Sequence, residues 1–204
     1  MPELDHSAVW AAARPYMRTR KNDIHIPLSY DYAARLLERH PDADAEVVLL
    51  AILLHDIGWA VVDQEAMLGE AFGENAMEAD VRFAHEREGA RLAREILGGL
   101  DHPAEVIEEV CAIIDGHDTR PHAISRNDEL VKDADALWRF SVVGTAIACD
   151  WWGETPSAYG RRVTAMIDER LFTQTAREIA RAELAETARV LRFAQLDDPV
   201  PAAP

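Results

Sequence analysis

The sequence is poor in cysteine, in positive charge and in long apolar segments. Its cysteines, Cys111 and Cys149, form no C-x-x-C pair, so we expect neither a disulfide framework nor a thiolate zinc site. No apolar run reaches the roughly 18 residues of a membrane helix. The N-terminus also lacks the apolar core and cleavage site of a secretory signal. We therefore expect a cytoplasmic protein.

Acidic residues outnumber basic ones by 37 to 21, and the formal net charge is -16. This balance argues against binding to a nucleic-acid duplex, because such footprints are basic. It still allows a small anionic substrate, which needs only a metal and a few local cations. The expected partner is therefore a small anionic molecule, with no membrane contact and with a homodimer left open.

Strand signals are weak, and the apolar residues follow helical spacing, so we predict an all-α fold. The chain reads as one domain over residues 1–204, with a core at about 22–150, C-terminal helices at about 156–196 and a frayed tail at 197–204. We expect residues 60–81 to form a long loop with short helical pieces that covers a site. Helices are expected at residues 7–17, 25–40, 45–58, 82–97, 103–114, 129–149, 156–171 and 173–195.

The chain is organised around AEVVLLAILLHDIGW, residues 45–59. Its apolar part, residues 47–54, could be a buried parallel strand, but a helix is favoured because the run with its cap is long and Gly58 stands where a helix C-terminal glycine would. The segment carries His55 and Asp56 into the interior. Metal coordination is the usual reason for burying such a pair.

Further histidines and aspartates fall on inward faces of other predicted helices. One metal would take His25, His55, Asp56 and Asp135, where Asp135 is favoured over Asp133 by its helical phase. A second metal would take His85 and His117, with Asp56 bridging. Imidazole and carboxylate donors suit two divalent ions per chain, namely iron, manganese, zinc or cobalt, with nickel and magnesium also open.

The ordered set resembles the HD superfamily of metal-dependent phosphohydrolases. The similarity lies in the isolated His25, then LLHDIGW with His55 and Asp56, and then Asp135 in a DAD sequence. FAHEREGARLAREIL and IIDGHD are similar to the superfamily's next helices. The resemblance covers residues 22–149 and implies an HD-domain-like helical bundle with a five-helix core and additional C-terminal helices.

The extra His85 and His117 resemble the members that hold two metals. Those members include phosphohydrolases and also oxygenases similar to inositol oxygenase and to a phosphonate-cleaving oxygenase. Inositol oxygenase carries a substrate-binding lysine three residues after its His-Asp pair, where this sequence has Trp59. That departure counts against inositol oxygenase itself, although not against the wider oxygenase group.

Two enzymatic hypotheses and one non-enzymatic hypothesis follow. The first is a phosphohydrolase for a small phosphorylated molecule, with His55 and Asp56 as catalytic residues. The second is a mixed-valent di-iron oxygenase that cleaves a C–C or C–P bond, and the third is a ligand-sensing domain with a vestigial site. Substrate contacts are predicted for Arg82, Lys132 and Trp59. Other polar residues are expected at the surface or outside the ligand set, namely His6, His40, His102, His122, Asp80, Glu86 and Asp118.

Overall fold

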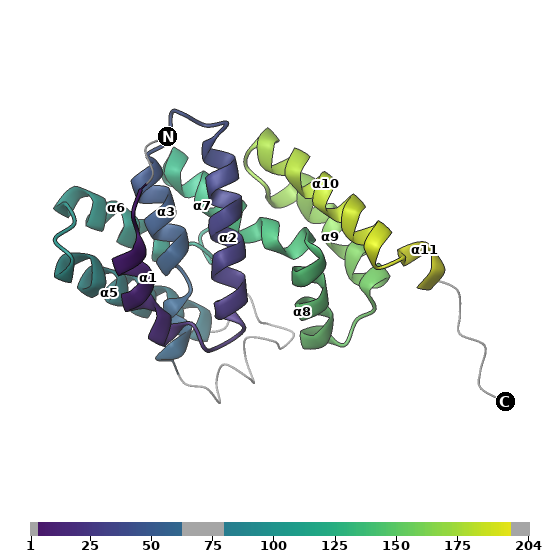
Figure 1. The fold of residues 1–204 in the computed structure, drawn as a ribbon, viewed down its shortest axis with the longest axis horizontal. Helices are drawn as coiled ribbons and strands as arrows, with labels where there is room; N and C mark the ends of the chain where they lie inside the picture. The colour runs from purple at the N-terminus through teal and green to yellow at the C-terminus, as the bar shows by residue number, and fades with distance from the viewer. Residues whose placement is uncertain (1–3, 63–79, 197–204) are drawn as a thin grey trace. The chain divides into compact units, whose positions relative to one another are not determined.

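The structure is a computed structural model, and it describes residues 4–62 and 80–196 (Figure 1). Helices and turns account for both ranges and neither contains a strand, which confirms the all-α prediction. The predicted loop at 60–81 falls mostly outside the described residues, as does the predicted tail at 197–204. None of the helices in the described ranges is long and apolar enough to span a bilayer.

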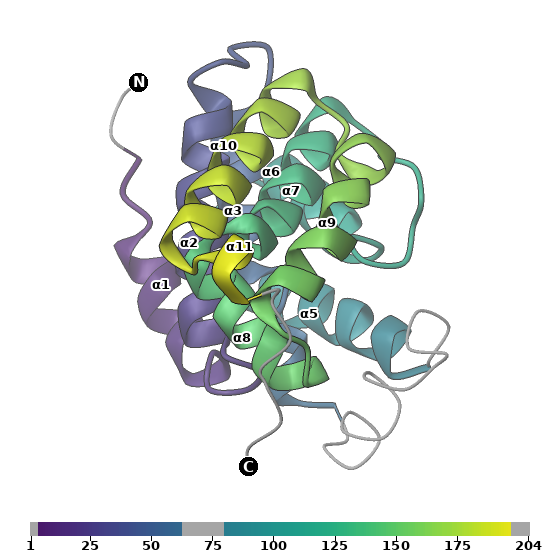
Figure 2. The same ribbon diagram turned by 90° about the vertical axis from the view of Figure 1, so that its right-hand side faces the viewer.

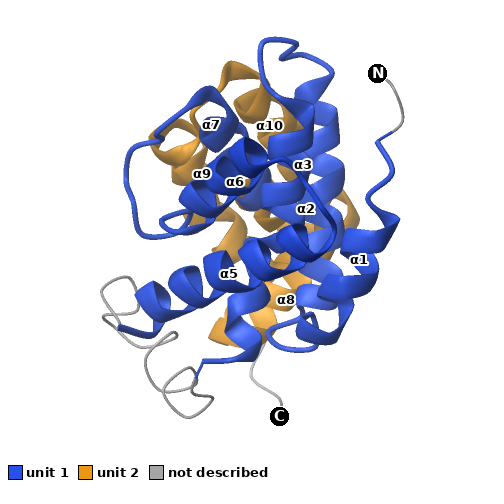
Figure 3. Cartoon of the chain, turned by 90° about the vertical axis from the view of Figure 1, so that its left-hand side faces the viewer, with its two compact units in different colours: residues 1–135 blue, residues 136–204 orange. Residues whose placement is uncertain are grey.

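The chain divides into two compact units, Met1–Asp135 and Ala136–Pro204 (Figure 3). Within the first unit, α5 packs on α6, and α2 lies beside α3. The helices that lie in this unit, including most of α7, are α1 (Ser7–Ala13), η1 (Arg14–Tyr16), α2 (Asn22–Leu37), α3 (Ala45–Leu54), η2 (Ile57–Ala60), α5 (Asp80–Gly99), α6 (Ala104–Ile114) and α7 (Arg126–Leu137).

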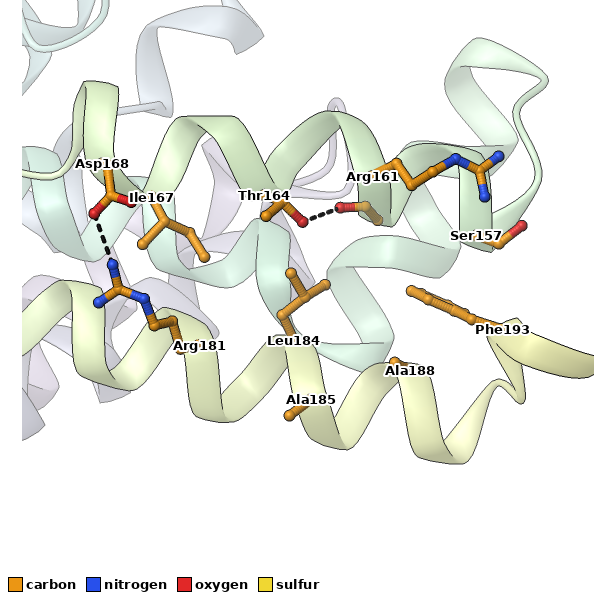
Figure 4. Close-up of a pocket in the computed structure, with 11 residues that line it drawn as sticks. Ser157, Arg161, Thr164, Ile167, Asp168, Arg181, Leu184, Ala185, Ala188 and Phe193 are labelled. Carbon is orange, nitrogen blue, oxygen red and sulfur yellow. Dashed lines mark hydrogen bonds and ion pairs between the residues drawn. The ribbon is translucent and has the colours of Figure 1, made fainter. Parts of the chain in front are cut away.

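In the second unit, α8, α9 and α10 pack on one another, as Figure 2 shows for α9 and α10. A cavity of about 530 Å³ lies between α9 and α10, with Ile167, Leu184 and Phe193 among its walls (Figure 4). Its lining includes no histidine. The elements of this unit are η3 (Trp138–Phe140), α8 (Val142–Trp152), α9 (Pro156–Arg170), α10 (Gln174–Val190) and α11 (Phe193–Leu196).

Helix α3 is the central element of the first unit. Asp44 caps it, because its side chain accepts hydrogen bonds from the amides of Glu46 and Val47. Residues 47–54 are each at most 5 % exposed, so the helix is buried on all sides. The helical interpretation of this run is therefore confirmed, and the strand alternative is wrong.

Gly58 does not end α3, contrary to the prediction. The helix stops at Leu54, and Gly58 lies in η2, where it allows close approach of α5. A Cβ atom on Gly58 would lie 2.0 Å from the carbonyl oxygen of His85. The glycine is therefore needed for backbone contact between η2 and α5 rather than for a left-handed turn.

The single helix predicted at 129–149 is wrong. Helix α7 ends at Leu137, and α8 begins only at Val142, after η3. Ser141 separates them, because its hydroxyl accepts a hydrogen bond from the amide of Gly144 and donates one to the carbonyl of Trp138. Side-chain capping of this kind competes with continuation of a helix.

Candidate metal centre

Helices of the first unit bring all six predicted metal ligands together. His25 comes from α2, His55 and Asp56 from the end of α3, and His85 from α5. The remaining two are His117, just beyond α6, and Asp135 in α7. None of the six residues is more than 9 % exposed.

We call the first part of this cluster the His25 half, which comprises His25, His55 and Asp135. The Nε2 atoms of His25 and His55 lie 2.9 Å apart. Oδ1 of Asp135 lies 3.2 Å from Nε2 of His25 and 3.5 Å from Nε2 of His55. These three donor atoms therefore converge on one point.

The second part, the His85 half, comprises His85, His117 and Asp118. The Nε2 atoms of its two histidines lie 3.5 Å apart, and Oδ2 of Asp118 lies 3.8 Å from Nε2 of His85. Arg82 forms an ion pair of 2.7 Å with the same oxygen of Asp118. This half thus contains a carboxylate that the sequence analysis left out of the ligand set.

Asp56 lies between the two halves and divides its oxygens between them. Its Oδ2 lies 3.4 Å from Nε2 of His25 and 3.7 Å from Nε2 of His55. Its Oδ1 lies 3.6 Å from Nε2 of His85 and 3.5 Å from Nε2 of His117. This is the arrangement expected of a carboxylate that bridges two cations.

The chemistry of the donor set fits a cation. Nδ1 of His55 lies 2.7 Å from the carbonyl oxygen of Ile52, and Nδ1 of His117 lies 2.9 Å from that of Ile114. Because a carbonyl oxygen only accepts, we assign the proton of each neutral ring to Nδ1, which turns the Nε2 lone pair toward the cluster. The Nε2 lone pairs and the carboxylate oxygens then face one another. They form three overlapping groups, and within each group the donor atoms lie within 4.8 Å of one another.

In the metal-free protein, a proton on one histidine balances part of the negative charge of the cluster. Burial disfavours a charged His117, but its hydrogen bond to Asp56 and the negative charges of Asp118, Asp56 and Glu86 raise its pKa to about 9. Burial and the neighbouring His117 lower the pKa of His85 to about 3. His85 is therefore neutral while His117 is protonated near neutral pH.

Trp59 contacts two members of the cluster. Its ring stacks on His85 with centroids 3.9 Å apart and an angle of 13°, and its Nε1 donates a hydrogen bond of 3.0 Å to Oδ1 of Asp56. On its other side the guanidinium of Arg20 lies 4.2 Å from the ring centroid. Trp59 thus orients the Asp56 carboxylate and the His85 imidazole, whereas the sequence predicted it as a substrate contact.

The other predicted substrate contacts, Arg82 and Lys132, are placed differently. Arg82 borders the His85 half through Asp118, and its Nε has no hydrogen-bond partner within the described ranges. Lys132 instead donates its ammonium hydrogens to the carbonyls of Gly116, His117 and Arg120. Since an ammonium has three donors, Lys132 is fully engaged by the backbone and is not retained as a substrate contact.

Several polar residues were assigned wrongly or missed. Glu86 is only 1 % exposed rather than solvated, and His6 is 4 % exposed and bonded to Tyr30 and Glu46. Asp118 follows a ligand directly, so regular helical phase would turn it away from the cluster. The turn at Gly116, with φ of +129°, redirects the chain just before His117. The glycine directly before His117 and Asp118 was the feature of the sequence that could have indicated this turn.

Comparisons with known proteins identify the family of the chain and support its fold. The family model described as HD domain matches residues 23–139 of the chain. The crystal structure of a predicted HD superfamily hydrolase from an uncultured Thermotogales bacterium is similar, with a TM-score of 0.63 and 22 % identity over 96 % of this chain and 95 % of that one. No curated protein matches the sequence. The family match spans more than half of the chain and contains the clustered histidines and aspartates, so this protein belongs to the HD-domain family.

Proposed function

We propose that the protein is a metal-dependent phosphohydrolase that acts on a small phosphorylated molecule, with nucleotides as the first class to test. The observation that carries this proposal is Asp56, whose two oxygens each face a pair of imidazoles. Asp56, together with the four histidines and Asp135, would hold divalent cations. Cations bound there would supply an activated water and neutralise charge on the attacked phosphoryl group.

The residues of the chain have distinct roles in this proposal. His55 and Asp56 are the catalytic residues because they border both halves of the cluster. His25 and Asp135 complete the first set of donors, whereas His85 and His117 supply the second. Asp118 is added to the second set on the strength of its 3.8 Å approach to His85.

Arg82 is the proposed cation for the substrate. Its side chain is 13 % exposed, and one amino group is held by Asp118 while Nε lacks a partner among the described residues. A guanidinium fixed at one end presents its other donors in a defined direction. That geometry suits a phosphate oxygen.

Phosphate release from a panel of phosphomonoesters and nucleotides tests this function, with metal-loaded and chelated protein compared. We expect metal-dependent release that Asp56→Asn abolishes. Arg82→Gln should raise KM, whereas Arg87→Gln, an exposed position on the same helix, should leave it unchanged. The proposal fails if metal-loaded protein releases phosphate from no member of the panel.

A di-iron oxygenase is the second candidate, and one observation favours it. The cluster offers imidazole and carboxylate donors to both halves, as a di-iron centre would require. Oxygen consumption that depends on ferrous iron and on a small polar substrate would support this reaction. Full activity with zinc, which has no redox chemistry, would exclude it.

A further inference from the structure

The loop Gly116–Arg120, with the sequence GHDTR, carries His117 and Asp118 between two buried charged side chains. Glu86 reaches it from α5 and is 1 % exposed, and Lys132 reaches it from α7 and is 9 % exposed. Burying an ionised group costs free energy unless its hydrogen bonds are satisfied. Both groups are satisfied by this loop.

Glu86 holds the amide side of the loop. Its Oε1 accepts hydrogen bonds from the amides of Asp118 at 2.8 Å and Thr119 at 2.9 Å. Its Oε2 accepts one from the hydroxyl of Thr119 at 2.6 Å. Lys132 holds the carbonyl side, with Nζ at 2.7 Å from the oxygens of Gly116 and His117 and at 3.0 Å from that of Arg120.

The peptide group between His117 and Asp118 is held at both ends. Its oxygen accepts from Lys132, and its N–H donates to Glu86. In a trans peptide these two groups point in opposite directions, so the peptide dipole lies between a positive and a negative charge, which fixes its plane. This peptide joins two donors of the His85 half.

The two halves of the cluster differ in their support. His25 and Asp135 project from regular helices, and His55 lies at the end of α3. His117 and Asp118 instead follow the end of α6, beyond a glycine with φ of +129°. Contacts outside a helical ladder therefore hold this stretch. Nδ1 of His117 lies 2.9 Å from the carbonyl oxygen of Ile114, and Asp118 pairs with Arg82. The backbone that joins the two residues is held by Glu86 and Lys132.

We propose that Glu86 and Lys132 clamp the His117–Asp118 peptide and thereby position the donors of the His85 half, so that loss of the clamp weakens metal binding at this half more than at the His25 half. Both are positioning residues, because they act through the loop backbone. The inference rests on the metal-binding part of the proposed function and not on its substrate. Failure to release phosphate would therefore leave it intact.

The test is anaerobic titration of metal-free protein with Co²⁺, followed by calorimetry and by visible absorption. Wild type should bind two equivalents. In Glu86→Ala and Lys132→Met, one equivalent should bind as in wild type, while the other weakens by about 10- to 100-fold, the effect typical of residues that orient metal ligands. Glu86→Gln keeps an acceptor oxygen and should restore much of the weakened site, which loss of packing alone would not explain.

Glu109→Ala is the matched control. Glu109 also lies on a helix of the first unit and accepts hydrogen bonds from Ser125 and Asn127, away from the cluster. This variant should bind both equivalents as wild type does. Far-UV circular dichroism verifies folding, and if Glu86→Ala does not fold, Glu86→Gln and Lys132→Met carry the test.

Three results would overturn the proposal. The first is that both equivalents bind to Glu86→Ala and Lys132→Met as well as to wild type. Another is an equal weakening of both equivalents in the folded variants, because the clamp would then not act on the His85 half in particular. The third is a single equivalent in wild type.

Discussion

Replacing Gly58 with alanine places a methyl group where the backbones of η2 and α5 touch. The new Cβ would lie 2.0 Å from the carbonyl oxygen of His85 and 2.5 Å from the amide nitrogen of Gly89. Both distances fall well short of ordinary van der Waals contact, and backbone atoms cannot rotate away. Overpacking typically costs about 1–3 kcal/mol, and we expect Gly58→Ala to destabilise the protein by about 3 kcal/mol or more.

Two further glycines, Gly89 and Gly98 on α5, supply controls at which an added methyl group meets less crowding. A Cβ on Gly89 would lie 3.1 Å from the carbonyl oxygen of His55, whereas one on Gly98 would meet nothing within 4 Å. Alanine gains about 1 kcal/mol over glycine within a helix. We therefore expect Gly89→Ala to be nearly neutral and Gly98→Ala to stabilise by about 0.5 kcal/mol.

Urea unfolding of the three variants without metal measures their free energies of unfolding and tests this order of stability. Gly58→Ala should also bind one equivalent of Co²⁺ more weakly than wild type, because separating η2 from α5 moves His85 away from Asp56. A Gly58→Ala variant that is as stable as Gly98→Ala would refute the described contact between η2 and α5. It would also remove the basis for placing His85 beside Asp56.

Three more predictions follow from the cluster. His117 has a pKa of about 9 in the metal-free protein and binds metal only as a neutral ring. The metal affinity of the His85 half should therefore rise about tenfold for each unit by which the pH is raised, up to about pH 9. Calorimetry in buffers of different ionisation enthalpy should show that about one proton is released on metal binding. Trp59→Phe keeps an aromatic ring beside His85 but removes the hydrogen bond to Asp56. Metal binding should therefore weaken by about 10- to 100-fold, while the circular dichroism spectrum stays unchanged. An unchanged metal affinity would count against the role of Trp59 in orienting Asp56. Asp135→Asn should abolish metal binding at the His25 half. Asp133→Asn should lower thermal stability but leave the metal content unchanged. If metal analysis shows the reverse, Asp133 rather than Asp135 is the ligand.

Helical periodicity was enough to predict most of the elements that position the cluster. The continuous apolar run that ends at His55 and the helical phase of His85 were both readable from local sequence, and the structure places both residues in the cluster around Asp56. The break before α8 was not predictable in this way. It depends on the cap that Ser141 forms with the carbonyl of Trp138 and the amide of Gly144, and apolar periodicity carries no sign of such a cap.

The polar support of the cluster was the least predictable part. Glu86 and Lys132 have the spacing of ordinary surface charges, and only the path of the loop after Gly116 turns its amides toward one and its carbonyls toward the other. The position of Asp118 beside His85 was not predictable for the same reason. Positions set by a left-handed turn and by long-range hydrogen bonds are not encoded in local sequence spacing.

Metal content per chain, measured by elemental analysis on protein purified without added metal and without oxygen, distinguishes a centre for two metals from a centre for one. We expect close to two divalent ions per chain in wild type, and one in a His85→Ala variant. One ion per chain in wild type, unchanged by His85→Ala, would contradict the assignment of two halves bridged by Asp56.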